Sequence, residues 1–225
     1  MTKSPKDAQA WVALATAWTQ RANAAASNPK AAVASYEAAA KALASAAKLK
    51  PNDITIQKAL AAAYTSEASG YQAAYSQVAQ QASDIQAASP DSSQFAPAAA
   101  ASALDPFTQA EQSIVSKQSS DLQQQALPLY TKASDSSKQA LDVYLKITKL
   151  TPNDAVNWFN MAEAAQGAGD TANAIKGYKE FLRILPGDPL APQVKSAIAQ
   201  LQPKPKASTS TTPTTSTATA PTTTG

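Results

Sequence analysis

The stretch TPNDAVNWFNMAEAAQGAGDTANAIKGYKEFLRILP, residues 151–186, decides the fold. Its apolar residues recur at the three- and four-residue spacing of amphipathic helices, over about 155–168 and 171–185. Gly169 and Asp170 join these two segments. The stretch therefore predicts a hairpin of two helices.

Two nearly identical hexapeptides mark helix boundaries along the chain, KLKPND at 48–53 and KLTPND at 149–154. In each, the proline disfavours a helical residue before it, and the aspartate is a good N-cap for the next helix. The lysine lies near the negative end of the preceding helix. Such joints are expected between repeated units, but the two copies are 101 positions apart.

The stretch between the second joint and Pro186 resembles a tetratricopeptide repeat (TPR). Pro152 and Pro186 are 34 positions apart, which is the length of that repeat. The family pattern is W-x2-L-G-x2-Y, then A-x3-F, then P. Its positions are occupied, with conservative replacements, by Trp158, Met161, Ala162, Ala165, Ala174, Tyr178 and Pro186. The resemblance implies one repeat unit over residues 153–186.

The same pattern indicates two further units. The first, residues 5–51, has a hairpin longer by 12 residues and matches at Trp11, Leu14, Ala15, Trp18, Ala39 and Leu43. The second, residues 52–152, matches at Gln57, Leu60, Ala61, Tyr64, Ala140 and Tyr144. Its halves lie 67 residues farther apart than those of the third unit. One repeat length, 34 residues, beyond its first matching positions the chain is rich in proline and does not match the pattern again. The excess therefore predicts one elongated hairpin and not hidden repeats.

Heptad spacing supports the elongated hairpin independently. One arm carries a seam of Tyr64, Ala68, Tyr71, Tyr75, Val78, Ala82 and Ile85. The return arm carries Val115, Leu122, Ala126, Leu129, Ala133, Ala140 and Ile147, with Ser119 and Ser136 at two seam positions. We expect an antiparallel coiled-coil finger that extends roughly 30 Å beyond the repeats.

The whole chain is expected to be all-α, a solenoid of TPR-like helical hairpins. Helices are predicted over about 8–26, 30–49, 54–88, 108–150, 155–168, 171–185 and 192–201. A loop is expected at about 89–107 and a kink at Pro128. Residues 187–201 should hold a capping helix with Val194, Ile198 and Leu201 on one face. Residues 202–225, rich in Thr, Pro and Ser, are predicted to be disordered.

Composition excludes most catalytic chemistry. The chain has no cysteine and no histidine, which removes disulfides, thiol nucleophiles, Ser-His triads and nearly every zinc or haem site. The carboxylates Glu37, Asp142 and Glu163 are not paired at a telling spacing. We therefore expect a protein that is not an enzyme, with no catalytic residues, no cofactor and no metal site.

Charge and hydropathy bear on partners and location. The net charge is +3, and the lysines are spread along the helices without a basic patch, so no nucleic-acid partner is expected. No apolar run approaches a membrane span, and the start MTKSPKDAQA lacks the apolar region of a signal peptide. We expect a soluble chain without direct membrane insertion. It also resembles alanine-rich bacterial repeat proteins with a very long second hairpin, which are often anchored outside the cytoplasm, and this implies an extracytoplasmic location.

The resemblance also implies a binding groove, because TPR proteins generally bind partners along the first helix of each unit. The groove positions here are Gln9, Val12, Thr16, Thr55, Lys58, Ala62, Val156, Phe159 and Glu163. Phe159 is either the apolar anchor for a peptide or a residue packed under the last helix. Chaperone-binding family members hold a C-terminal carboxylate with basic groove residues. Only Lys58 could supply such charge, so no carboxylate clamp is expected.

Two other aromatic sets have alternative interpretations. The helical spacing of Tyr64, Tyr71 and Tyr75 favours packing in the seam over a binding stripe. In the loop, Phe95, Leu104 and Phe107 either fold back onto the finger or dock a partner. The Thr/Pro tail is read as plain disorder, with a glycosylated stalk and a cell-wall spacer as alternatives.

The sequence thus predicts a noncatalytic scaffold or adaptor that binds a peptide or a partner helix in the TPR groove. The alternative is a structural protein in which the long hairpin mediates homo-oligomerisation and the repeats support it.

Overall fold

The described part of the chain is helical. The computed structural model describes residues 6–87 and 106–202, without the side chains at 106–109 and 111. Within these ranges there is no strand, and the helices are α1 (Ala8–Ala24), α2 (Pro29–Leu49), α3 (Ile54–Ala87), α4 (Pro106–Leu150), α5 (Ala155–Ala168), α6 (Thr171–Ile184) and α7 (Ala191–Leu201). The predicted all-α class is confirmed, and each helix begins and ends within two residues of its expected position.

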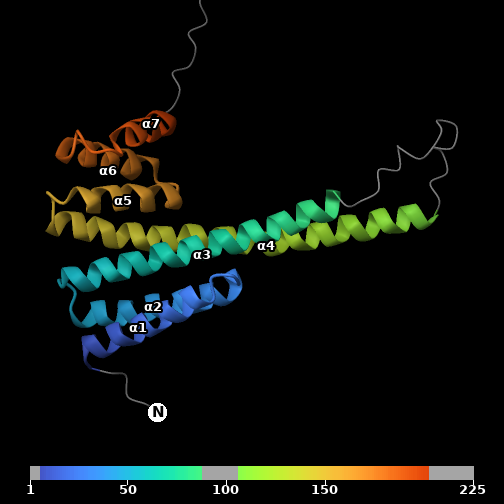
Figure 1. Ribbon diagram of the computed structural model, residues 1–225, viewed down its shortest axis with the longest axis horizontal. Helices are drawn as coiled ribbons and strands as arrows, with labels where there is room; N and C mark the ends of the chain where they lie inside the picture. Colours follow the sequence, from blue (N-terminus) through green and yellow to red (C-terminus); the bar gives the residue numbers. More distant parts are fainter. Residues whose placement is uncertain (1–5, 88–105, 203–225) are drawn as a thin grey trace, which may run out of the picture.

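The helices form hairpins that lie side by side in chain order (Figure 1). Each helix packs chiefly against the helices before and after it in the sequence. The far parts of the long helices α3 and α4, about residues 75–87 and 106–130, project together as a finger (Figure 1). The base of this hairpin packs against α2 and α5. The predicted loop lies outside the described residues apart from Pro106 and Phe107, which begin α4, and the tail from residue 203 lies outside them as well.

Polar caps explain where these helices begin. Five of the described helices start after an Asp or Asn whose side chain accepts a hydrogen bond from a backbone N–H in the first turn: Asp7, Asn28, Asp53, Asp154 and Asp170. This contact satisfies a donor that the helix itself cannot pair. Between α5 and α6, Gly169 has a φ of 77°, a conformation that favours glycine at a helix end.

Small residues let the helices of the body approach closely. The main core joins α1 to α5 through buried alanines together with larger side chains such as Leu43, Ile147 and Met161. The approach is also close between α5 and α6. A Cβ at Gly177 would lie 2.7 Å from the Trp158 carbonyl oxygen and 2.9 Å from the Ala162 Cβ. A second cluster, with Tyr178, Phe181 and Val194, closes the C-terminal end, and α7 lays Val194, Ile198 and Leu201 on it as predicted.

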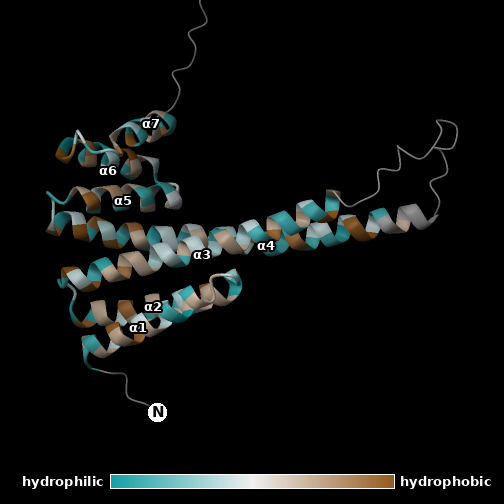
Figure 2. Ribbon diagram, in the orientation of Figure 1, coloured by the Kyte–Doolittle hydropathy of each residue, from teal (hydrophilic) through white to brown (hydrophobic). Residues whose placement is uncertain are grey.

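The predicted seam is buried along most of the α3–α4 hairpin. Its buried members in the described residues are Ala68, Tyr71, Val78 and Ala82 on α3 and Ser119, Ala126, Ala133, Ser136, Ala140 and Ile147 on α4. Strongly hydrophobic residues are sparse along the finger (Figure 2). The finger is therefore held by small and polar side chains over much of its length.

The two serines in the seam each form a hydrogen bond between α3 and α4. Gln86 donates its Nε2 to Ser119 Oγ at 2.8 Å, and Ser136 donates its hydroxyl to Glu67 Oε1 at 3.1 Å. Tyr75 departs from the seam. Its side chain is 36% exposed and packs on Tyr130, with ring centroids 5.9 Å apart.

Pro128 lies inside α4, and the helix continues through it. Proline has no N–H, so the carbonyl of Gln124 loses its helical donor. Both residues are exposed, so water can satisfy that carbonyl. The helix predicted to run through Pro128 is therefore confirmed, and the kink there stays a prediction.

Candidate functional site

Two depressions lie on either side of α3 and share part of their lining. The first, about 300 Å³, is bordered by the α1–α2 turn, α2 and α3, and includes Tyr36 and Gly70. The second, about 410 Å³, lies where α3, α4 and α5 meet, and we call it the junction pocket. Thr65 and Ser69 line both depressions. The two therefore form one continuous surface across α3, which we call the α3 face.

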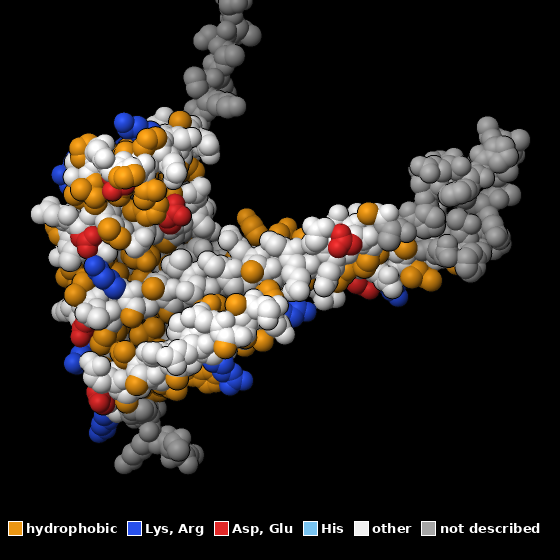
Figure 3. Space-filling model, in the orientation of Figure 1, with side chains coloured by type: hydrophobic (Ala, Val, Ile, Leu, Met, Phe, Trp, Pro, Cys, Tyr) orange, Lys and Arg blue, Asp and Glu red, His pale blue; other side chains and the backbone are white. Residues whose placement is uncertain are grey.

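The lining of the junction pocket is mostly polar. Its polar side chains come from three helices and are Thr65, Ser69, Gln72, Ser137, Glu163 and Gln166. Thr65 donates its hydroxyl to the carbonyl of Ala61 at 3.0 Å and also forms a side-chain hydrogen bond with Tyr144, which leaves one lone pair of its oxygen as an acceptor. Charged side chains are sparse on the face of the molecule seen in Figure 3, and Glu163 is the only ionisable group in the lining of this pocket.

The inner wall of the pocket depends on a close crossing of α5 over α4. A Cβ at Gly167 would lie 2.6 Å from Ser137 Oγ, so a larger residue there would displace the serine. The Ser137 side chain is only 8% exposed, lines the pocket, and makes no hydrogen bond to any described residue. It is thus a nearly buried hydroxyl without a protein partner in the described part of the chain.

Glu163 is oriented from behind by α6. The buried Tyr178 donates its hydroxyl to Glu163 Oε1, and its phenol oxygen lies 3.0 Å from Gln166 Oε1. A phenol has one proton, which the charged carboxylate receives. Two oxygens without a proton between them repel, so we assign the Gln166 amide the flipped orientation, in which its Nε2 donates to the phenol. Burial, the Glu163 hydrogen bond and the Glu163 charge raise the pKa of Tyr178 well above its ordinary value, so the phenol stays protonated.

The predicted groove positions are mostly exposed. Gln9, Thr16, Thr55, Lys58, Ala62, Val156 and Glu163 are exposed, while Val12 and Phe159 are half-buried. Of this set, Glu163 lies in the junction pocket. Thr65 and Ser69 were not predicted, although helical steps of three and seven residues from Ala62 lead to them. Ser137 belongs to a second helix of a hairpin, and no sequence signal pointed to it.

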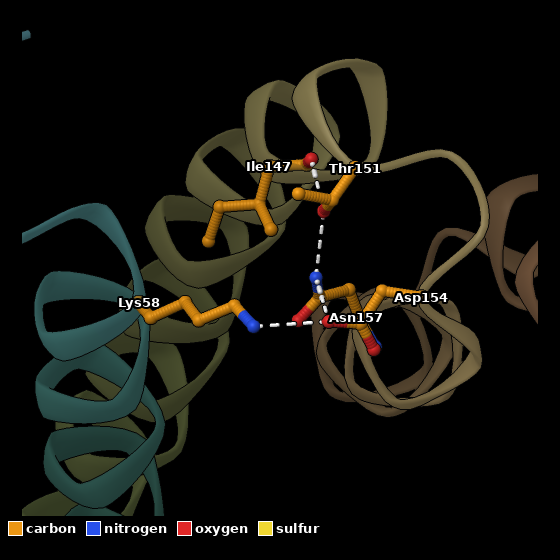
Figure 4. Close-up of polar contacts among 5 residues, drawn as sticks. All are labelled: Lys58, Ile147, Thr151, Asp154 and Asn157. Carbon is orange, nitrogen blue, oxygen red and sulfur yellow. Dashed lines mark hydrogen bonds and ion pairs between the residues drawn. The ribbon is translucent and has the colours of Figure 1, made fainter. Parts of the chain in front are cut away.

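Lys58 is held in a polar contact between α3 and the start of α5 (Figure 4). Its Nζ lies 3.0 Å from Asp154 Oδ2. Asn157 Nδ2 donates to the same oxygen at 2.8 Å and to Thr151 Oγ1 at 2.8 Å, and Thr151 donates to the carbonyl of Ile147 at 2.9 Å. The predicted groove charge thus pairs with the aspartate of the second joint and links two hairpins.

The protonation of Asp154 reflects this contact. Burial alone would raise the pKa of Asp154. The hydrogen bond and charge of Lys58, together with the backbone N–H groups of Asn157 and Val156, outweigh burial, so the pKa lies below its ordinary value. The carboxylate is therefore charged when it caps α5 at neutral pH.

Phe159 packs inward against α6. Its ring centroid is 5.9 Å from that of Tyr178 and 5.4 Å from that of Phe181. It belongs to the cluster that α7 closes with Val194. These contacts favour the second of the two interpretations of Phe159, in which it packs under the last helix. Val156, by contrast, is 59% exposed at the start of α5.

The structure describes the tyrosines of the predicted seam but not the side chains of the predicted loop residues. Tyr71 is buried in the seam and donates its hydroxyl to Glu37, with Lys132 Nζ 5.1 Å from its ring centroid. Tyr64 is half-buried at the edge of the main core. The loop residues Phe95 and Leu104 lie outside the described residues, and only the backbone of Phe107 is described, in the first turn of α4.

The described residues hold neither a cluster of metal ligands nor a membrane-spanning helix. No group of three His, Cys, Asp or Glu residues converges there as a metal site would require. None of the described helices combines the length and the apolar character needed to cross a membrane. Among known proteins, no family model matches the chain, and no curated sequence matches it significantly.

Proposed function

We propose that the chain is a noncatalytic scaffold or adaptor of TPR-like hairpins that binds a partner polypeptide across the α3 face. The observation that carries this proposal is the pair of adjoining depressions that share Thr65 and Ser69. Ligand sites are usually concave and largely preformed, and this surface joins all three hairpins. On α3, the exposed groove positions Lys58 and Ala62 precede Thr65 and Ser69 at helical spacing, so they continue the same side of the helix.

The proposed partner segment is an extended peptide or one helix. A partner that follows it would contact Tyr36 at one end, Thr65 and Ser69 in the middle, and Gln166 at the other end. Such a partner would add hydrogen bonds to polar side chains, with apolar contacts from the alanines between them. The proposal assigns no chemical step to the chain.

A blocking substitution tests the proposal. Ser69 is exposed between the two depressions, and Ser69→Trp should fill part of both. The amount of partner polypeptide captured from the source organism should be at least tenfold lower for Ser69→Trp than for the intact chain. It should stay unchanged with Gln200→Trp, an exposed control on α7. Partners that are retained equally by both variants would contradict binding at the α3 face.

A second function, self-association through the finger, is favoured by one observation. Leu127 and Tyr130 are 67% and 59% exposed on one side of α4, beside the 36% exposed Tyr75. Exposed apolar groups in close proximity are typical of contact surfaces. Light scattering of the intact chain and of a Leu127→Gln, Tyr130→Gln variant tests it. A monomer at all concentrations for the intact chain would reject this second function.

A further inference from the structure

The junction pocket has a negative charge with no cation beside it. Glu163 does not form an ion pair with any described residue, and no other ionisable group lines the pocket. One carboxylate oxygen accepts the Tyr178 hydroxyl, which leaves the second oxygen open to a ligand. A bound group of positive charge would therefore meet an oriented, unneutralised carboxylate.

The remaining polar groups of the pocket offer acceptors around this charge. The Ser137 hydroxyl is nearly buried, lacks a hydrogen-bond partner among the described residues and lines the same cavity. Thr65 uses its proton on Ala61, and its oxygen has room for one acceptor contact beside that with Tyr144. Glu163, Ser137 and Thr65 belong to three different helices, so a ligand that satisfies them needs several donors spread in space.

Size and donor geometry distinguish the basic side chains. The pocket volume of about 410 Å³ falls in the range of roughly 300–1,000 Å³ that is typical of ligand sites. A guanidinium presents five N–H donors in a planar fork and pairs with a carboxylate through two parallel hydrogen bonds. An ammonium presents three donors from one point. The dispersed acceptors fit the guanidinium better.

We propose that the junction pocket binds the guanidinium of an arginine in the partner polypeptide, with Glu163 as its counter-ion and Ser137 as a second acceptor. This inference rests on the proposed function, because it names the chemistry of the ligand on the same face. The proposed site also differs from a carboxylate clamp in the sign of its charge. A clamp presents positive side chains to the partner, whereas this pocket presents a negative one.

Short peptides test the inference directly on the full chain. The probes are acetylated and amidated pentapeptides of four alanines around a central arginine, citrulline, glutamate or leucine. Backbone amide shifts in nitrogen-15 NMR spectra report where each peptide binds. The arginine peptide should shift the amides of Ser69, Gln166 and Gly167, and its affinity should fall at least tenfold when neutral citrulline replaces arginine.

Two variants make the charge requirement specific. Glu163→Gln keeps an acceptor for Tyr178 and should weaken the arginine peptide at least tenfold without unfolding the chain. Glu180→Gln, at the exposed ion pair with Arg183 on α6, should leave binding unchanged. Ser137→Ala should weaken binding severalfold.

The outcomes separate this inference from the proposed function. Equal shifts from the citrulline or leucine peptide would keep the α3 face as a binding surface and overturn the arginine assignment. An unchanged affinity in Glu163→Gln would overturn it too. If no peptide shifts these amides, the arginine assignment is wrong, and the capture experiment with Ser69→Trp still decides the proposed function by itself.

Discussion

Gly177 fixes how closely α5 and α6 pack. An added Cβ would lie 2.7 Å from the backbone oxygen of Trp158 and 2.9 Å from both Ala162 Cβ and Met161 Cε. A backbone oxygen cannot rotate away, so the helices would have to separate. That separation would also disturb Tyr178, which follows Gly177 by one position and orients Glu163.

Gly177→Ala should therefore destabilise the chain. Overpacking costs about 1–3 kcal/mol, and the better helix propensity of alanine offsets up to about 1 kcal/mol of this. We expect a net loss of about 1–2 kcal/mol in the free energy of unfolding, measured by urea denaturation. Gly187→Ala is the matched control, because a Cβ there meets nothing within 4 Å. Equal stability of the two variants would show that the contact is not tight.

Asp154 gives the contact between α3 and α5 a pH dependence. Its pKa is lowered in the folded chain, so its stabilising effect is present above the ordinary value of 3.8 and is lost as pH falls through the folded pKa. Asp154→Asn keeps an N-cap but loses the ion pair with Lys58. The variant should be less stable at pH 7 by at most about 1 kcal/mol, because the pair is partly exposed.

The difference between Asp154→Asn and the parent chain should shrink toward zero below about pH 3.8. Urea denaturation at pH 7 and at pH 3 measures it. The same series in a Lys58→Gln background is the control, and there the pH 7 difference should be smaller. A difference that is constant with pH would mean that the carboxylate charge contributes nothing.

At the residue scale, the TPR resemblance named Glu163 as a groove position, and nothing in the sequence pointed to the pocket around it. The resemblance selects positions along the first helix of each hairpin and gives no information on residues from a second helix. Ser137 and Gly167 meet only because α5 crosses α4 closely, and that distance depends on side chains 30 positions apart in sequence. Helical periodicity carries no information on such a crossing.

Among the elements, the finger is the one whose stability depends least on large apolar side chains. Its seam places Val78 among small residues such as Ala82 and Ala126, together with the hydrogen-bonded Ser119. Helical pairs of this kind open locally more easily than a core rich in leucine. The local free energy of opening should therefore decrease from the body toward the far end of the finger.

Val78→Ala tests this view of the finger. Val78 is 3% exposed, and removing two methyl groups should lower the local opening free energy by about 1–2 kcal/mol. Hydrogen exchange followed by mass spectrometry should show faster exchange over residues 75–86 and unchanged exchange in α5 and α6. Gln77→Ala, at an exposed neighbouring position, is the control. Faster exchange throughout the chain would show that the finger and body unfold as one unit.

The helix boundaries were predictable because their signals are local. Asp53, Asp154 and Asp170 cap the helices that follow them, and Gly169 takes the left-handed conformation. The role of Pro128 was less predictable. An exposed proline leaves its lost hydrogen bond to water, so α4 continues through Pro128 as the predicted helix over 108–150 does, and the kink there stays a prediction.

For the whole molecule, the two joints KLKPND and KLTPND define where the hairpins meet. The first ends α2, and the second ends α4. Their wide separation corresponds to the long α3–α4 hairpin, whose base forms part of the α3 face and whose far part is the finger (Figure 1). The two proposed functions therefore use different ends of the same hairpin.

A site-specific photo-crosslinker decides between these two ends most directly. Benzoylphenylalanine at position 69 reports contacts of the α3 face, and at position 130 it reports contacts of the finger. Adaptor function predicts crosslinks to another polypeptide from position 69 that disappear when excess arginine pentapeptide is added. Crosslinks from position 130 to a second copy of the chain, with none from position 69, would contradict it.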